Sequence, residues 1–255
     1  MPTQHLTSGW AGRVALWTPL GVYAFIYPFG IGLLLGGWMP PGAGWVGGVL
    51  LMAQGLGMSA WLGLNAGWRG LAAAVVVGGA AWALEAVGVT TGVPFGRYSY
   101  SAALGWGLGP VPLAIPCAWI AGVAAAWGVA QRLLPAGRAA AVILLAAALT
   151  TGQDAVLETI ATRVQGYWTW APTAAPYYGV PWANFVTWAV ATAVLAAAIT
   201  MLVRPPLGRL RYSGVPILIY SMSLVMFGLL NVAQGFVLPA LLAGGLLVVL
   251  AWRLR

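Results

Sequence analysis

The sequence predicts an all-α integral membrane protein with about eight transmembrane helices and irregular, Pro- and Gly-rich outer loops. Hydrophobic residues make up 62% of the 255-residue chain, charged residues make up only 5%, and the mean hydropathy is +0.91. A soluble domain carries about 25% charged residues, so this composition excludes the soluble class. We expect residues 1–255 to form a single polytopic membrane domain.

Apolar stretches of about 20 residues, the length that crosses a bilayer as a helix, predict where the spans lie. The predicted spans are residues 14–36, 45–65, 70–90, 111–131, 139–160, 183–203, 214–232 and 235–252. Very few residues separate the last two stretches, so an arrangement with seven spans remains open.

The arginines support eight spans, with both chain ends in the cytoplasm and the protein in the cell membrane. All eleven basic residues are arginines, and the positive-inside rule places most of them on the cytoplasmic side. With eight spans, only Arg97 and Arg163 lie on the outer side of the membrane. The nine on the inner side are Arg13, Arg69, Arg132, Arg138, Arg204, Arg209, Arg211, Arg253 and Arg255. They are scattered singly, which argues against a nucleic-acid partner.

The chain has only three acidic residues, and all lie in or at the ends of apolar stretches: Glu85, Asp154 and Glu158. A carboxylate at membrane depth costs a few kcal/mol at least, and such residues usually mark a functional site. Glu85 follows Arg69 at the same spacing in the sequence as Asp154 follows Arg138. At about 1.5 Å per residue, both carboxylates stand about 24 Å above the cytoplasmic surface. The three acids therefore converge if the third and fifth spans are neighbours.

The remaining polar residues exclude several kinds of chemistry. No Cys/His cluster or Gly-rich phosphate loop is present, and the only histidine, His5, lies in a polar tail. Metal, nucleotide and nucleophilic-triad mechanisms are disfavoured. Acid–base chemistry between a protonated carboxyl group and a carboxylate remains, and it suits the addition of water across an alkene.

Two long motifs carry a resemblance to a known family. The first is EAVGVTTGVPFGRYSY with LGPVPLAIPCAW, over residues 85–119, and the second is GYWTW with YYGVPWANFVTW, within residues 154–188. They resemble the membrane-embedded carotenoid hydratases of the carotenoid biosynthesis protein family, which act on γ-carotene, lycopene or bisanhydrobacterioruberin. The resemblance implies a hydro-lyase that hydrates the terminal double bond of an acyclic (ψ) carotenoid end without a cofactor. Its partners would be a lipophilic carotenoid, membrane lipid and neighbouring enzymes of the carotenoid pathway.

The resemblance also implies roles for individual residues. Glu85 matches the acid that opens the first motif, and Asp154 and Glu158 match a pair of acids spaced by four residues. The family pattern has an aspartate followed by proline at position 158 and an aromatic residue at 153, where this chain has Glu158 and Gln153. We expect Glu85 and Asp154 to be the acid/base pair, in either order, and Glu158 to tune them or hold water. The expected substrate-binding residues are Trp82, Arg97, Tyr98, Trp168, Trp170, Tyr178, Asn184 and Trp188.

Structural roles remain open for several of these residues. The aromatic residues of 167–182 are also typical of an interfacial belt, and Arg97 and Arg163 can neutralise the acids as ion pairs. Asn184 can instead cap the sixth helix, and Gln54 is expected to be a helix-packing polar group.

Other functions also remain open. A proton-coupled transporter needs few buried carboxylates, a carotenoid-binding protein would need none of them, and a ψ-end cyclase or isomerase would share the protonation step with a hydratase.

Overall fold

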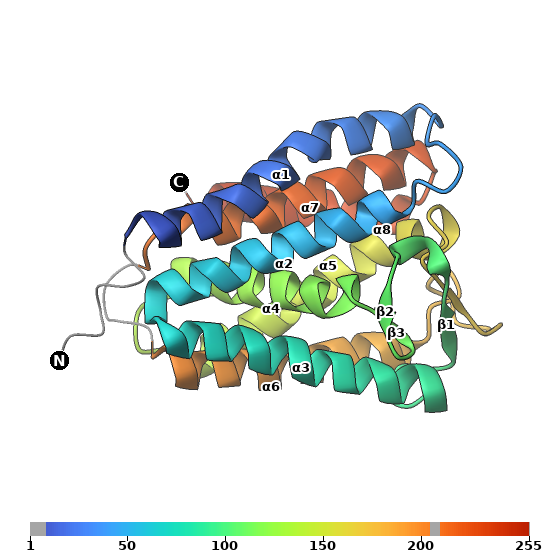
Figure 1. Cartoon of the computed structure of the whole chain (residues 1–255). Helices are drawn as coiled ribbons and strands as arrows, with labels where there is room; N and C mark the ends of the chain where they lie inside the picture. Colours follow the sequence, from blue (N-terminus) through green and yellow to red (C-terminus); the bar gives the residue numbers. More distant parts are fainter. Residues whose placement is uncertain (1–8, 205–209, 255) are drawn as a thin grey trace.

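The computed structural model describes residues 9–204 and 210–254, and it confirms an all-α membrane protein with eight long helices in that part of the chain (Figure 1). Their ends differ from the predicted spans by at most four residues. His5, Arg209 and Arg255 lie outside the described residues. The helices are α1 (Trp10–Leu35), α2 (Trp45–Ala66), α3 (Trp68–Thr91), α4 (Ala114–Leu133), α5 (Ala139–Arg163), α6 (Trp182–Val203), α7 (Gly214–Ala233) and α8 (Val237–Arg253).

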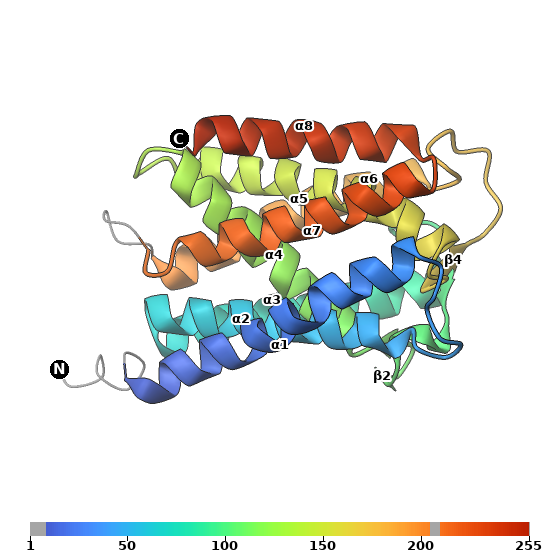
Figure 2. The same cartoon turned by 90° about the horizontal axis from the view of Figure 1, so that it is seen from above.

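Helices α1 to α7 are long and apolar enough to cross a membrane. Helix α8 is also apolar but has only 17 residues, which is about 25 Å of helix against a hydrocarbon core of about 30 Å. It lies at the edge of the bundle and packs against α5 and α7 (Figure 2). The last predicted span is therefore a helix, but it is the shortest of the eight.

Helix α4 is the centre of the bundle, because it packs against α2, α3, α5, α6 and α7. All eight of its residues from Val123 to Ala130 are buried, and five of them are Ala or Gly. Small side chains let transmembrane helices approach closely, and close packing is a main source of their association. A helix apolar on every side is expected at such a central position.

The two ends of the bundle differ in composition. The start of α1 and the end of α8 lie at one end, and the short strands lie at the other (Figure 1). Arg97 and Arg163 are at the strand end. The remaining described arginines, at the opposite end, are Arg13, Arg69, Arg132, Arg138, Arg204, Arg211 and Arg253.

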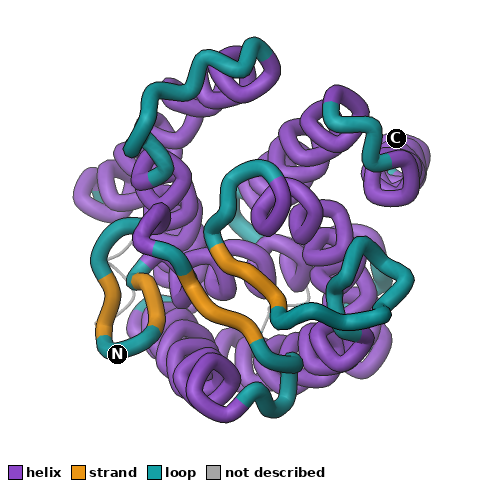
Figure 3. Tube along the Cα trace, turned by 90° about the vertical axis from the view of Figure 1, so that its right-hand side faces the viewer, coloured by secondary structure: helices purple, strands orange, loops and turns teal. Residues whose placement is uncertain are grey.

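Short strands and loops cover the strand end of the bundle (Figure 3). β1 (Tyr98–Tyr100) pairs antiparallel with β4 (Trp168–Trp170), although these strands are far apart in the sequence. After the 3-10 turn η1 (Ala102–Leu104), β2 (Gly107–Leu108) pairs with β3 (Val111–Pro112) in a hairpin. Because β3 uses these residues, α4 begins at Ala114 and not at the predicted residue 111.

The contact between α2 and α4 gives a testable prediction about packing. A methyl group on Gly55 would lie 2.6 Å from the carbonyl oxygen and 2.7 Å from the Cα of Cys117, and backbone atoms cannot move aside easily. We expect Gly55→Ala to force the two helices apart and to destabilise the protein by about 1–3 kcal/mol, as overpacking does. The measurement is the midpoint of thermal unfolding in detergent.

Gly79→Ala in α3 is the matched control, because a methyl group there meets no atom of the described residues within 4 Å. Alanine is also preferred to glycine inside a helix by about 0.5–1 kcal/mol. The control should therefore keep or slightly raise the midpoint. Equal midpoints for the two variants would contradict the close approach of α2 and α4.

Candidate functional site

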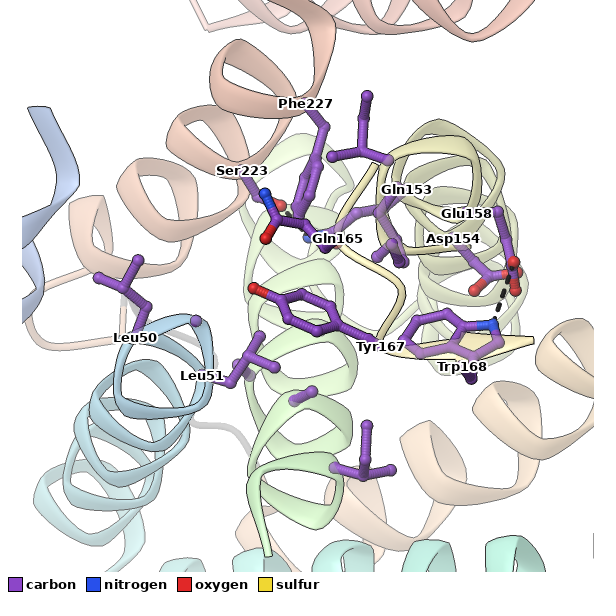
Figure 4. Close-up of a pocket in the computed structure, with 18 of the residues that line it drawn as sticks. Leu50, Leu51, Gln153, Asp154, Glu158, Gln165, Tyr167, Trp168, Ser223 and Phe227 are labelled. Carbon is purple, nitrogen blue, oxygen red and sulfur yellow. Dashed lines mark hydrogen bonds between the residues drawn. The ribbon is translucent and has the colours of Figure 1, made fainter. Parts of the chain in front are cut away.

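The three acidic residues line one cavity near the strand end of the bundle. Glu85 comes from α3. Asp154 and Glu158 come from α5, one helical turn apart, and both are drawn in Figure 4. Their side chains are 5%, 2% and 1% exposed. The cavity has a volume of about 140 Å³ and is lined mainly by apolar and aromatic side chains. The predicted convergence of the acids is therefore present in the structure.

The acids lie on the third and fifth helices, as the sequence indicates, but these helices are not direct neighbours. In the structure both α3 and α5 pack against α4 and α6, and these two helices lie between them. Glu85 enters the cavity from α3, and Asp154 and Glu158 enter it from α5 on the other side of α4 and α6.

Glu85 accepts hydrogen bonds from three aromatic side chains. The hydroxyl groups of Tyr98 and Tyr100 donate to Oε2 at 2.5 Å and 2.7 Å, and the indole Nε1 of Trp119 donates to Oε1 at 2.9 Å. The bonds come from β1 and α4, so Glu85 links the strand end to the central helix. A buried carboxylate needs such donors, because without them its desolvation is very unfavourable.

Asp154 and Glu158 share one amide donor. The Nδ2 of Asn184 donates to Asp154 Oδ2 at 2.8 Å and to Glu158 Oε1 at 3.2 Å. Glu158 Oε2 also accepts from the indoles of Trp168 at 3.3 Å and Trp170 at 3.1 Å, and the bond from Trp168 is drawn in Figure 4. The side chain of Asn184 makes no capping bond at the start of α6, so it serves the carboxylates instead.

The ribbon of β1 and β4 places four of these donors on one face. Side chains alternate along a strand, and Tyr98 pairs with Trp170 while Tyr100 pairs with Trp168. The ring centroids of these pairs are 5.1 Å and 6.2 Å apart. The middle pair, Ser99 and Thr169, points outward and is exposed. The aromatic face of the ribbon therefore caps the carboxylates, and its polar face is turned away.

Burial keeps the phenols of the ribbon in their donor form. Burial and the neighbouring Glu85 carboxylate both raise the pKa of Tyr98 and of Tyr100. A phenol whose pKa is raised stays protonated, so each can donate to Glu85 throughout the ordinary pH range.

Two indoles form a flat wall beside the acids. The rings of Trp119 and Trp188 are stacked, with centroids 3.6 Å apart and planes 6° from parallel. Both residues line the cavity, and Trp119 is also a donor to Glu85. Aromatic faces can stabilise a cation that lies over them.

Most of the predicted site residues lie in the cavity lining, but Trp82, Arg97 and Tyr178 do not. The indole of Trp82 donates to the carbonyl of Leu108 at 3.1 Å and so lies toward the β2–β3 hairpin. Arg97 is exposed. Tyr178 has a positive φ of 51°, and its ring packs on Tyr177 and Phe236. The cavity therefore gives no support for a substrate-binding role of these three residues, and that role stays a prediction.

The arginine ion pairs considered from the sequence are also not what holds the acids. Among the described residues, every side-chain donor to the three carboxylates is a tyrosine, a tryptophan or Asn184. Arg163 donates instead to the carbonyl of Tyr178.

Sequence reasoning missed several residues of the site. Tyr100 lies two residues after Tyr98 on the same face of an extended segment, so alternation was a usable signal. Trp119 and Ser223 lie on other helices, and only the packing of those helices brings them to the cavity. Gln54, which was expected only to pack, also lines it. In the described part of the chain no three His, Cys, Asp or Glu side chains are placed to hold a metal ion.

The hydrogen bonds to Glu85 give a second prediction. We expect Tyr100→Phe to lower the free energy of unfolding by about 1–3 kcal/mol, because it removes a donor to a buried carboxylate. Ser99→Ala, on the exposed face of the same strand, should have no effect. Thermal unfolding of the two variants in detergent measures this difference, and a Tyr100→Phe protein as stable as Ser99→Ala would show that this hydrogen bond is not important.

Comparison with known proteins identifies the family. Residues 46–250 match the family model described as carotenoid biosynthesis protein. A segment of 116 residues, 44% of this chain, is 33% identical to bisanhydrobacterioruberin hydratase of Haloarcula japonica and spans 39% of that protein. No solved structure matches. The family match covers most of the chain and confirms the resemblance found in the sequence, so the chain belongs to the carotenoid biosynthesis protein family.

Proposed function

We propose that this protein is a carotenoid hydratase, which adds water across the terminal double bond of an acyclic (ψ) end group and gives a tertiary hydroxyl. The observation that carries the proposal is a set of three buried carboxylates in one apolar cavity with aromatic walls. The family and the hydratase named among its relatives support it. Alkene hydration needs only a proton donor, a base and water, so it fits a site built from carboxylates.

The volume of the cavity suits the binding of the end group of the substrate alone. The volume is about 140 Å³, and an engineered apolar cavity of about 150 Å³ holds one benzene molecule. The cavity can therefore enclose a terminal isoprene unit but not a long polyene. The remainder of the polyene would lie outside this volume, and the apolar side of the cavity wall, on α1, α2 and α7, is the side on which it would leave. This side of the wall consists of Gly30, Leu34, Leu50, Leu51, Met226, Phe227 and Leu230.

In the proposed reaction Glu85 and Asp154 form the acid/base pair. A protonated carboxyl group of the pair gives its proton to the less substituted carbon of the double bond, and a tertiary cation forms on the other carbon. The stacked rings of Trp119 and Trp188 stabilise that cation. Water then forms the C–O bond and returns a proton to a carboxylate, so the site is regenerated with no net change in charge.

Glu158 and Asn184 have a positioning role in this scheme. The amide of Asn184 bonds both Asp154 and Glu158, so it fixes the orientation of the Asp154 carboxyl group toward the cavity. The indole donors on β4 hold Glu158 in turn. Preorganised groups of this kind lower the barrier because they need not rearrange during the reaction.

The uneven distribution of arginine supports an orientation in the cell membrane. We propose that the arginine-rich end of the bundle, with both chain ends, faces the cytoplasm, as the positive-inside rule predicts. The acids then lie toward the opposite surface, in the last turns of α3 and α5 before the strand end. A carotenoid would reach this level from within the bilayer.

The central prediction concerns the acids. In a host that accumulates lycopene, Glu85→Gln and Asp154→Asn should each abolish hydroxylated carotenoid, because an amide can neither give nor take the proton. Thr169→Val, on the outer face of the ribbon, should leave the product as in the wild type. The measurement is chromatography of the pigments with mass detection, together with the amount of protein in the membrane fraction.

Each alternative function gives a different result in this experiment. Hydration adds the mass of one water to the product, whereas cyclisation or isomerisation adds none. A transporter or a binding protein changes neither the mass nor the structure of the pigment. A wild-type chain that yields no product heavier by one water would refute the proposal, and so would an unchanged product in both amide variants.

A further inference from the structure

A second polar group lines the cavity away from the acids. Gln153 of α5 and Ser223 of α7 are 8% and 4% exposed, and both contribute to the cavity wall. The Nε2 of Gln153 donates to the Oγ of Ser223 at 2.8 Å. In Figure 4 this pair lies toward α7, while Asp154 and Glu158 lie toward the other side of α5. The reaction scheme above does not use either residue.

One polar atom of the Gln153 amide has no partner. Its Oε1 is buried and accepts no hydrogen bond from the described residues. If the amide is turned over, Oε1 meets Ser223 and Nε2 is the atom left over, so the conclusion does not depend on the orientation. An unpaired polar atom in a buried site costs about 1–3 kcal/mol. The pair therefore has one unused hydrogen-bonding position for a small polar ligand, at a part of the cavity wall away from the carboxylates.

We propose that Gln153 and Ser223 hold the water molecule that is added to the substrate. This inference rests on the proposed function and assigns a part of the site that the carboxylates leave open. A hydrocarbon end group offers no hydrogen bond to the amide, whereas water can both donate and accept. A buried water usually has two to four polar partners, and the Gln153 amide and the Ser223 hydroxyl supply two.

The helix geometry places this water correctly for the reaction. Consecutive residues of an α-helix point about 100° apart, because there are about 3.6 residues per turn. Asp154 points toward Asn184 of α6, and Gln153 points toward Ser223 of α7. An end group that lies against α5 would then have a carboxyl group on one side and the water on the other.

The chemical balance follows from this arrangement. A carboxyl proton forms the new C–H bond, the water oxygen forms the new C–O bond at the cation, and the water returns one proton to a carboxylate. If the water is absent, the cation must lose a proton from a neighbouring carbon instead. The product is then an isomer of the substrate with the same mass.

The test measures the ratio of hydroxylated to isomerised carotenoid in a lycopene-accumulating host. We expect Gln153→Leu to lower this ratio about tenfold, the effect of one lost hydrogen bond, and Ser223→Ala to lower it less. The total amount of substrate converted should change much less than the ratio. A purely structural role of the pair would lower the total and leave the ratio unchanged.

Thr192→Val is the matched control. Thr192 of α6 is also buried, and its hydroxyl has no hydrogen-bond partner among the described residues, but it lies outside the cavity lining. The control should keep the wild-type ratio. If Gln153→Leu is missing from the membrane fraction, Ser223→Ala decides the question.

The outcomes separate this inference from the proposed function. If the wild-type chain makes hydroxylated product but neither variant changes the ratio, the water site is refuted and the hydratase proposal stands. If the wild-type chain makes no hydroxylated product, the proposed function fails and the water site fails with it. A lower ratio in the variants, with the control unchanged, supports the inference.

Discussion

This structure depends on one constraint. Three carboxylates lie inside a membrane-spanning bundle, and each needs hydrogen-bond donors there. Helix backbones cannot supply these bonds, because their own N–H groups are already used within the helix. The donors are therefore side chains, and five of the six lie on aromatic residues. An aromatic donor adds a hydrogen bond with little polar surface, so it suits a site that must also accept a hydrocarbon.

This constraint explains why the two outer loops form a ribbon. A single strand could present its donors to one acid only, whereas the β1–β4 pair presents two phenols to Glu85 and two indoles to Glu158. The pairing also satisfies backbone groups near membrane depth, where irregular backbone is stable only if protein or water covers it. The ribbon thus links α3 to α5 at the end of the bundle, although α4 and α6 separate these helices along their length.

The sequence could predict the transmembrane helices and the depth of the acids in the membrane, because both follow from lengths and spacings along the chain. Span lengths follow from bilayer thickness, and Glu85 and Asp154 share a level because each follows an arginine at the same spacing. Helix neighbours could not be predicted in this way. In lipid the helices are apolar on nearly every side, so periodicity does not show which face meets which partner. For this reason the sequence could state a contact between the third and fifth spans only as a condition, and in the structure α4 and α6 lie between them.

The contacts of individual side chains were harder to predict. Trp82 lies three residues before Glu85 on α3, so the two share a face of the helix. In the structure, however, the indole of Trp82 donates to the carbonyl of Leu108 and not into the cavity. Trp119 is distant from Glu85 in the sequence, and only the central position of α4 creates their contact. Proximity in sequence thus identified the two outer loops that contribute to the site, but it could not predict which side chains contact the acids.

Glu158 stands where the pattern that the sequence resembles has aspartate, and glutamate is longer by one methylene group. One oxygen of Glu158 accepts hydrogen bonds from the two indoles of β4, and the other accepts one from Asn184. All three donors come from elements other than α5, so the environment of this carboxylate depends on how β4 and α6 pack against α5. These hydrogen bonds are what make the burial of the carboxylate stable.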